Sequence, residues 1–205
     1  MNAMLLLADG TVFHGAGIGA AGTVTGEICF NTAMTGYQEV LTDPSYDGQI
    51  VVFTFPHIGN VGTNPEDIES KEHGANGLII REPITPPSNF RSTRSLEDWL
   101  KDKGITGIAG VDTRALTRKI RLEGARNCLI AYAENGQLPD VETLMLELIK
   151  VPNLGGLELA AGVTTKSNYA WDQTRWKLGQ GYGKRAKETL HVVAVDCQSS
   201  CPCVE

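Results

Sequence analysis

A polar, turn-rich stretch at residues 31–46 constrains the fold of this chain more than any other feature. It lies between apolar runs at 28–30 and 50–55. Asn, Thr, Gln, Asp and Ser side chains hydrogen-bond to nearby backbone, so we expect an irregular path here rather than a piece of core. Asp43-Pro44 predicts a rigid corner, because proline fixes φ and restricts the residue before it. Ser45 follows that corner, and we expect its hydroxyl to be presented from a loop, where binding residues often lie.

The rest of the chain predicts a mixed α/β domain. Apolar stretches at 4–7, 49–55, 77–80, 105–109 and 128–132, and a β-branched stretch at 23–30, predict strands, and a short apolar pair lies at 12–13. Asp9-Gly10 between 4–7 and 12–13 predicts a hairpin. Ser95, Asp112 and Asp140 are candidate N-caps of three helices. The side chains expected to face the core are Leu96, Trp99 and Leu100 in the first helix, Leu116 and Ile120 in the second, and Val141, Leu144, Leu148 and Ile149 in the third.

A glycine-rich segment at 15–22 formally matches the dinucleotide-binding fingerprint. It reads Gly17-Ile-Gly-Ala-Ala-Gly22, with Glu39 about 20 residues further on. That fingerprint requires a helix after the glycines, so that phosphate meets a helix N-terminus. Residues 23–30 are instead β-branched and predict a strand. We therefore interpret residues 15–22 as a loop between the hairpin and that strand, and a helix directly after Gly22 would favour a nucleotide-binding enzyme.

Several long motifs resemble one enzyme family, and they occur in the family's order over about residues 4–196. They are FNTAMTGYQEVLTDPSY at 30–46, PHIGNVGTN at 56–64, SNFR at 88–91, DTRALTR at 112–118 and HVVAVD at 191–196. The chain thereby resembles the small, glutamine-hydrolysing subunit of carbamoyl phosphate synthetase. The resemblance implies a swivelling three-layer β/β/α domain with mixed sheets at 1–152, an irregular linker at 153–189, and the first strand of a class I glutamine amidotransferase domain at 190–196.

The resemblance also implies a division of roles. The family's Cys-His-Glu triad belongs to the amidotransferase domain, beyond the end of this chain, so no catalytic residue is carried over and we expect the chain alone to be inactive. Ser45 matches the family serine that contacts glutamine across the domain interface; the alternative is a capping or turn hydroxyl without a ligand. The expected partner is the large synthetase subunit, to which ATP and metal belong; no cofactor is expected in this chain.

Charge and composition exclude some classes of function. The formal net charge is −6, which argues against nucleic-acid binding, since that depends on Lys and Arg neutralising phosphates. No apolar run approaches the roughly 20 residues that span a bilayer, and the N-terminus lacks the positive region of a secretory signal. Cys29 and Cys128 lie in apolar runs, as buried free thiols do, so we expect a cytoplasmic protein.

The last nine residues, 197–205, contain three cysteines and depart from the family pattern. Cys197, Cys201 and Cys203 have Cys-x3-Cys-x-Cys spacing, whereas structural zinc sites usually use four ligands in paired spacings. We interpret this segment as an aberrant tail that follows a shifted frame or a premature end, rather than as a metal site. The alternative is a free-standing, non-catalytic binding or regulatory module, which an ordered or metal-binding tail would favour.

Two further features each have two interpretations. His57 in the 56–64 motif is either an acid or base, since its unperturbed pKa is near 6.5, or a hydrogen-bonded structural histidine, which we favour. A basic cluster, Arg114, Arg118, Lys119 and Arg121, is expected on the outer face of the second helix. It is either a solvated helix face, which we favour, or a docking surface for an acidic partner.

Overall fold

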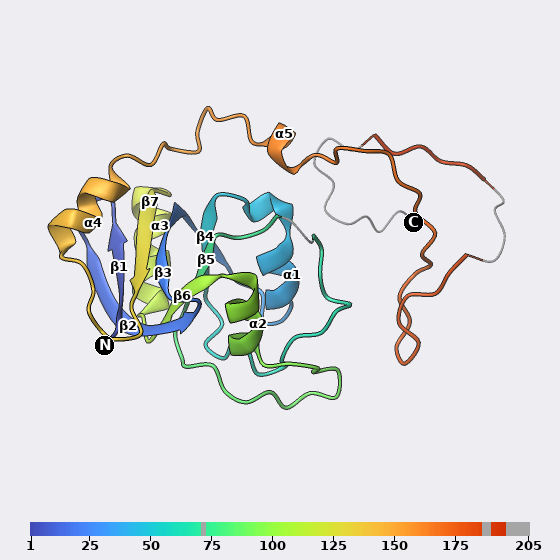
Figure 1. Cartoon of the computed structure of the whole chain (residues 1–205), viewed down its shortest axis with the longest axis horizontal. Coiled ribbons are helices and arrows are strands. Elements are labelled where there is room, and N and C mark those ends of the chain that lie inside the picture. The colour runs from blue at the N-terminus through green and yellow to red at the C-terminus, as the bar shows by residue number, and fades with distance from the viewer. Residues whose placement is uncertain (71–72, 186–189, 196–205) are drawn as a thin grey trace.

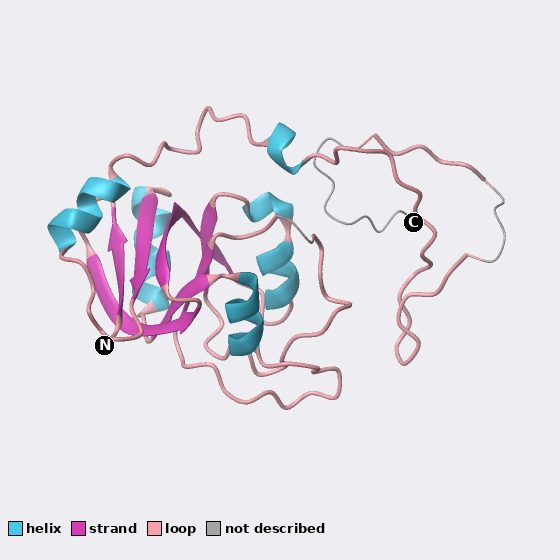
Figure 2. Ribbon diagram, in the orientation of Figure 1, coloured by secondary structure: helices cyan, strands magenta, loops and turns pink. Residues whose placement is uncertain are grey.

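The computed structural model describes residues 1–70, 73–185 and 190–195. The strands in these ranges form one closed sheet in the order β1-β2-β6-β5-β4-β3-β7 (Figure 1). The strands are β1 Ala3–Leu7, β2 Val12–Gly19, β3 Gly22–Asn31, β4 Gln49–Phe53, β5 Gly77–Ile80, β6 Thr106–Ala109 and β7 Asn127–Tyr132. The helices are α1 Tyr37–Thr42, the 3-10 helix η1 Pro44–Tyr46, α2 Leu96–Lys103, α3 Thr113–Glu123, α4 Val141–Leu148 and α5 Ala160–Val163. Figure 2 shows α4 on one side of the sheet, and α1 and α2 on the opposite side.

The sheet is mixed, which confirms the prediction of an α/β domain. β3, β4, β5 and β6 run parallel in succession, and the other pairs are antiparallel. The predicted Asp9-Gly10 hairpin joins β1 to β2, with Leu6 opposite Val12. Because hydrogen bonds join all these strands into one closed sheet, a division into separate layers is not confirmed, and the swivelling β/β/α description stays a prediction.

Both faces of most strands are apolar because alternate side chains enter two different cores. One set fills the inside of the closed sheet together with Leu116 and Ile120 of α3. On the outside, Leu78 and Ile80 of β5 pack with α2 side chains, and Met4, Leu6 and Leu129 pack under α4. Strands that are buried on both faces appear in sequence as continuous apolar runs, which is why length rather than alternation predicted them.

The predicted loop at 15–22 is wrong, because Gly15 to Gly19 belong to strand β2. A Cβ atom on Gly15 would lie 2.2 Å from the Ala109 carbonyl oxygen, and one on Gly17 would lie 2.0 Å from the Tyr132 ring. The glycines therefore permit close packing inside the closed sheet. β3 begins at Gly22 where the dinucleotide fingerprint requires a helix, so the nucleotide-binding interpretation is wrong as well.

Side-chain caps begin three helices where the sequence predicts them. Ser95, Asp112 and Asp140 accept hydrogen bonds from the backbone N–H of the residue three positions later, at 2.8–3.1 Å. The expected core face of the third helix is correct for Leu144 and Leu148. It is wrong for Val141 and Ile149, which are 37% and 71% exposed. Ile149 keeps helical φ and ψ and donates to the Met145 carbonyl oxygen at 3.0 Å, so it lies about 100° further round the helix than Leu148, outside the buried stripe.

The linker and the segment after it follow an irregular path in the described ranges. Apart from the single turn of α5, two isolated bridges, Gln173 with Lys184 and Lys177 with Gly181, are formed between residues 153 and 185. The strand predicted at 190–196 is absent over 190–195, where Val192, Val193 and Val195 are 71–83% exposed. A strand requires a neighbour to exchange backbone hydrogen bonds with, and among the described residues no strand pairs with this segment. The predicted aberrant tail at 197–205 lies outside the described residues, so the free-standing module is not tested.

Asp9 ties the β1–β2 turn to two distant elements. Its carboxylate lies 2.8 Å from Lys119 Nζ of α3 and 2.8 Å from an Arg126 guanidinium nitrogen just before β7. The backbone N–H of Thr11 donates to the same carboxylate at 2.9 Å. Burial by itself raises the pKa of Asp9, but the hydrogen bonds from Lys119 and Thr11 outweigh it and hold the pKa well below its usual range.

We expect Asp9→Asn to lower the free energy of unfolding by about 1 kcal/mol at pH 7, the upper end for a partly exposed ion pair. Because the folded-state pKa is lowered, this stabilisation is present above about pH 4 and is lost as pH falls through the folded-state pKa. Urea titrations of both proteins between pH 7 and pH 2 should show the difference shrinking. Asp172→Asn removes a more exposed pair, 3.7 Å from Lys184, and should change little. A difference that does not vary with pH would contradict this account.

Candidate functional site

Ser45 lies on a corner whose shape is fixed by its neighbours. The Asp43 carboxylate caps η1 by accepting a hydrogen bond from the Ser45 backbone N–H at 2.8 Å. Next to it, the Tyr46 hydroxyl accepts from Asn31 Nδ2 at 3.0 Å, which joins the two ends of the 31–46 stretch. The predicted corner at Asp43-Pro44 is therefore present. The irregular path predicted around it is wrong in part, because the stretch contains helix α1 as well as η1.

The Ser45 hydroxyl is available to a ligand. The residue is exposed, and within the described ranges its side-chain oxygen makes no hydrogen bond. Asp43 caps this turn, and the Ser45 hydroxyl does not. An exposed hydroxyl on a rigid corner provides one O–H donor and two acceptor lone pairs to a polar group placed against it.

The motif at 56–64 packs directly against the 31–46 stretch. The Tyr37 hydroxyl donates a hydrogen bond to the Gly62 carbonyl oxygen at 2.6 Å. The buried Gln38 amide pairs with the Asn64 backbone in both directions: Nε2 donates to the carbonyl at 2.7 Å, and Oε1 accepts from the N–H at 2.9 Å. These contacts fix the loop path, because each buried polar group has a partner whose loss would leave it unsatisfied.

The motif at 88–91 and part of the linker join the same cluster through Arg91. Its guanidinium donates to Asp67 Oδ1 at 2.6 Å, and Asp67 accepts from Asn64 Nδ2 at 2.8 Å through its other oxygen. Arg91 also lies under the Trp176 ring, 4.9 Å from the ring centre. The Trp176 indole N–H donates to Glu66 at 2.8 Å, so the linker is attached to the loops that pack against α1, just before the Ser45 corner.

Burial raises the pKa of one carboxylate in this cluster and of two thiols in the adjacent strands. Burial, and then the nearby Asp67 and Glu69 carboxylates, raise the pKa of Glu39. Burial also raises the pKa of the Cys29 thiol, to about 12, and that of Cys128 above its usual range. A thiol nucleophile requires the opposite shift, which a neighbouring base or cation provides. Neither described cysteine is therefore suited to attack a substrate.

His57 does not have the predicted structural role. Its side chain is exposed, and in the part of the chain that the structure describes its ring forms no hydrogen bond. The ring meets Phe55 edge to face, with ring centres 6.3 Å apart. The interpretation as a hydrogen-bonded histidine is wrong, because Ile58 and Gly59, rather than His57, turn into the core at this position.

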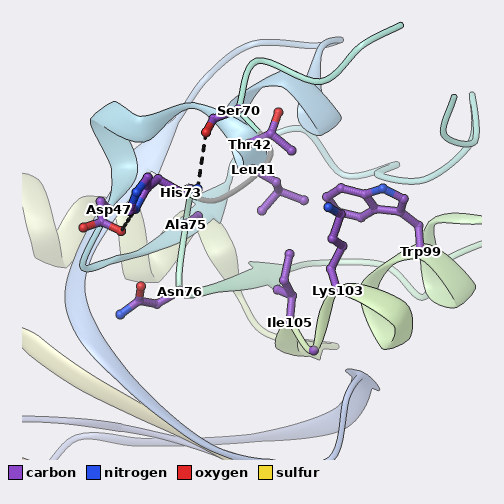
Figure 3. Close-up of a pocket in the computed structure, with 12 residues that line it drawn as sticks. Leu41, Thr42, Asp47, Ser70, His73, Ala75, Asn76, Trp99, Lys103 and Ile105 are labelled. Carbon is purple, nitrogen blue, oxygen red and sulfur yellow. Dashed lines mark hydrogen bonds and ion pairs between the residues drawn. The ribbon is translucent and has the colours of Figure 1, made fainter. Parts of the chain in front are cut away.

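The domain also has a shallow pocket of about 300 Å³ between α1 and the C-terminal end of α2 (Figure 3). On one wall His73 Nδ1 lies 3.9 Å from an Asp47 carboxylate oxygen, and Lys103 and Trp99 lie on the wall across from it. Ser45 is not among the residues that line the pocket. The hollow is therefore a separate feature from the exposed hydroxyl.

Over 1–70, 73–185 and 190–195, no group of three or more His, Cys, Asp or Glu side chains is arranged to hold a metal ion. Within the same ranges, no helix has the length and apolar character needed to cross a bilayer.

The comparisons with known proteins agree on one family. Residues 5–130 match the family model described as carbamoyl-phosphate synthase small chain, CPSase domain. The chain is 52% identical to the carbamoyl phosphate synthase small chain of Bradyrhizobium diazoefficiens, 52% identical to that of Brucella anthropi and 54% identical to that of Agrobacterium fabrum. These matches cover 95% of this chain and 49–50% of the relatives, so the chain spans about half their length.

Among solved structures, an aminopeptidase from Aneurinibacillus sp. strain AM-1 superposes on 64% of this chain and 30% of its own, with a TM-score of 0.38 and 16% identity. A likeness at this level carries no conclusion.

Proposed function

Since the chain belongs to the carbamoyl-phosphate synthase small chain family, we propose that it is the N-terminal part of the small subunit and contributes Ser45 to glutamine binding. The observation that carries this proposal is the exposed Ser45 hydroxyl, which has no described partner on a corner fixed by Asp43, Asn31 and Tyr46. A rigid corner limits the entropy lost when a ligand binds, which suits a positioning contact.

The proposed role of the whole assembly follows from the family. The small subunit would hydrolyse glutamine in its amidotransferase domain, and ammonia would pass to the large subunit. With bicarbonate and ATP, the large subunit would form carbamoyl phosphate for arginine and pyrimidine synthesis in the cytoplasm. ATP and metal would bind to the large subunit. In this proposal the present chain positions the substrate and the linker, and the bond to the glutamine amide nitrogen is broken elsewhere.

The loop cluster supports the positioning role. The Gln38–Asn64 pair, the Asp67–Arg91 pair and the Trp176 contact connect α1, the helix that leads into the Ser45 corner, to the linker at residue 176. In the proposal, this attachment directs a segment after the linker toward the corner. The proposal needs this arrangement, because a serine that reaches a ligand from a second domain must be placed within hydrogen-bond distance of it.

We expect Ser45→Ala, made at the matching serine of a full-length relative, to weaken the apparent affinity for glutamine about 3- to 10-fold, as loss of one neutral hydrogen bond does. The maximal rate of ammonia release should change little. Ser88→Ala, which removes a second hydroxyl from the family motifs, is the matched control. Glutaminase kinetics over a range of glutamine concentrations measure both quantities. An unchanged KM for the Ser45 variant would remove this residue from the site.

A further inference from the structure

Three arginines form a row on the exposed side of α3. Arg114, Arg118 and Arg121 are four and three positions apart, a spacing that places them on one face of a helix. All three are exposed, while Leu116 and Ile120 turn into the core on another side. α3 is drawn behind the strands in the view of Figure 1. Lys119, which the sequence places in the same basic cluster, lies off this row.

The guanidinium groups of the row have no counterion within the described residues. Their side chains form no ion pair or hydrogen bond there, and no residue three or four positions away on α3 is acidic. Lys119, in contrast, is neutralised by Asp9 at 2.8 Å and by Glu123 at 3.0 Å. Among the described residues, Lys119 beside the row is therefore paired with carboxylates, and the three arginines of the row are not.

The arginine row destabilises helix α3. Like charges at i,i+3 and i,i+4 repel one another, and Arg114 lies in the first turn, where the helix dipole disfavours a positive charge. The row also lies on a chain whose formal net charge is −6, so it is a local exception to the overall charge. A partner that carries carboxylates would remove the repulsion and pair with the forked guanidinium groups.

We propose that the arginine row is a docking surface for an acidic face of the large synthetase subunit. The proposal rests on the proposed function for the identity of the partner. Leu122 lies beside the row and is 72% exposed, which provides an apolar contact next to the charges. Arginine is among the residue types in which binding energy concentrates at protein interfaces.

The test measures binding of the full 205-residue chain to the purified large subunit of the Bradyrhizobium diazoefficiens enzyme, with that organism's small chain as the positive control. One variant combines Arg114→Glu, Arg118→Glu and Arg121→Glu. The matched control combines Lys103→Glu, Lys150→Glu and Lys166→Glu, which changes the net charge equally at exposed positions. Circular dichroism and thermal unfolding establish that both variants are folded.

We expect the arginine variant to associate at least 10-fold more slowly and the lysine variant to bind like the unchanged chain, with association weakening as salt rises. If the unchanged chain does not bind although the positive control does, the partner assigned in the proposed function is wrong. If the unchanged chain binds and the two variants lose affinity equally or not at all, the docking surface is wrong and the proposed function stands. Binding of a fluorescent single-stranded oligonucleotide through the same arginines at physiological salt would also overturn the surface, since it would indicate a phosphate partner.

Discussion

Gly15→Ala is expected to lower the free energy of unfolding by about 3 kcal/mol, the high end for an added carbon in a packed interior. The new Cβ would lie 2.2 Å from the Ala109 carbonyl oxygen and 2.8 Å from Ile108 Cγ1. The first of these atoms belongs to the backbone of β6, which pairs with β2 through Ala16 and Ala109. The Ile108 side chain could shift, but relief of the shorter contact would have to separate two hydrogen-bonded strands of a closed sheet, because that oxygen belongs to the backbone.

Gly155→Ala is the matched control, because no atom lies within 4 Å of its Cβ position. Its unfolding free energy should stay within about 0.5 kcal/mol of the unchanged chain, as for other exposed sites. Urea unfolding followed by circular dichroism measures both variants. Equal stabilities for the two alanine variants would show that β2 and β6 are not packed as closely as described.

Local sequence signals predicted the helices and most strands, but they could not predict close packing between residues that are far apart in the chain. Ser95, Asp112 and Asp140 act within three residues of themselves, so their caps are readable from sequence. Gly17 is different, because the ring that requires a glycine there belongs to Tyr132, far along the chain. A glycine-rich segment has few side chains and so shows no apolar pattern. The sequence therefore predicts a loop at 15–22, although Gly15 to Gly19 belong to strand β2.

The sequence predicted the turn that presents Ser45, but not the helix and the side-chain contacts around it. Asp43-Pro44 fixes the turn locally, and Ser45 follows from that turn and the family motif. The spacing of Tyr37 and Leu41, both buried on α1, is a helical signal that the polar composition around it obscured. The reciprocal contact of Gln38 with Asn64 joins residues 26 positions apart, and no pattern within either segment indicates it.

The segment at 190–195 shows a limit of a different kind. Its continuous apolar run is typical of a strand buried on both faces, yet the described residues offer it no neighbour, and its valines are exposed. An apolar composition indicates that a segment must be buried to be stable. Whether it becomes a strand depends on hydrogen-bonding partners that the segment itself does not contain.

The thiols of Cys29 and Cys128 bear directly on what the chain does with glutamine. Burial, and then the Glu27 carboxylate, raise the pKa of Cys29 from 9.0 to about 12. Burial, and then the nearby Cys29, raise that of Cys128. A rise from 9.0 to 12 is three powers of ten in the acid dissociation constant, so the thiolate of Cys29 at pH 7.5 is about 1,000-fold scarcer than that of an ordinary thiol. Hydrolysis of glutamine through a thioester needs a thiolate, and these two positions suppress it.

We therefore expect iodoacetamide to alkylate Cys29 about 1,000-fold more slowly in the folded chain than in guanidinium chloride at pH 7.5, as peptide mass spectrometry would measure. Because the folded-state pKa is raised, the native rate should still be rising between pH 10 and pH 11, where the rate for the unfolded chain has nearly levelled off. The chain by itself should release no ammonia from glutamine. If ammonia appears and the Cys29→Ser, Cys128→Ser double variant abolishes it, these thiols are nucleophiles, and the assignment of bond cleavage to another part of the assembly is wrong.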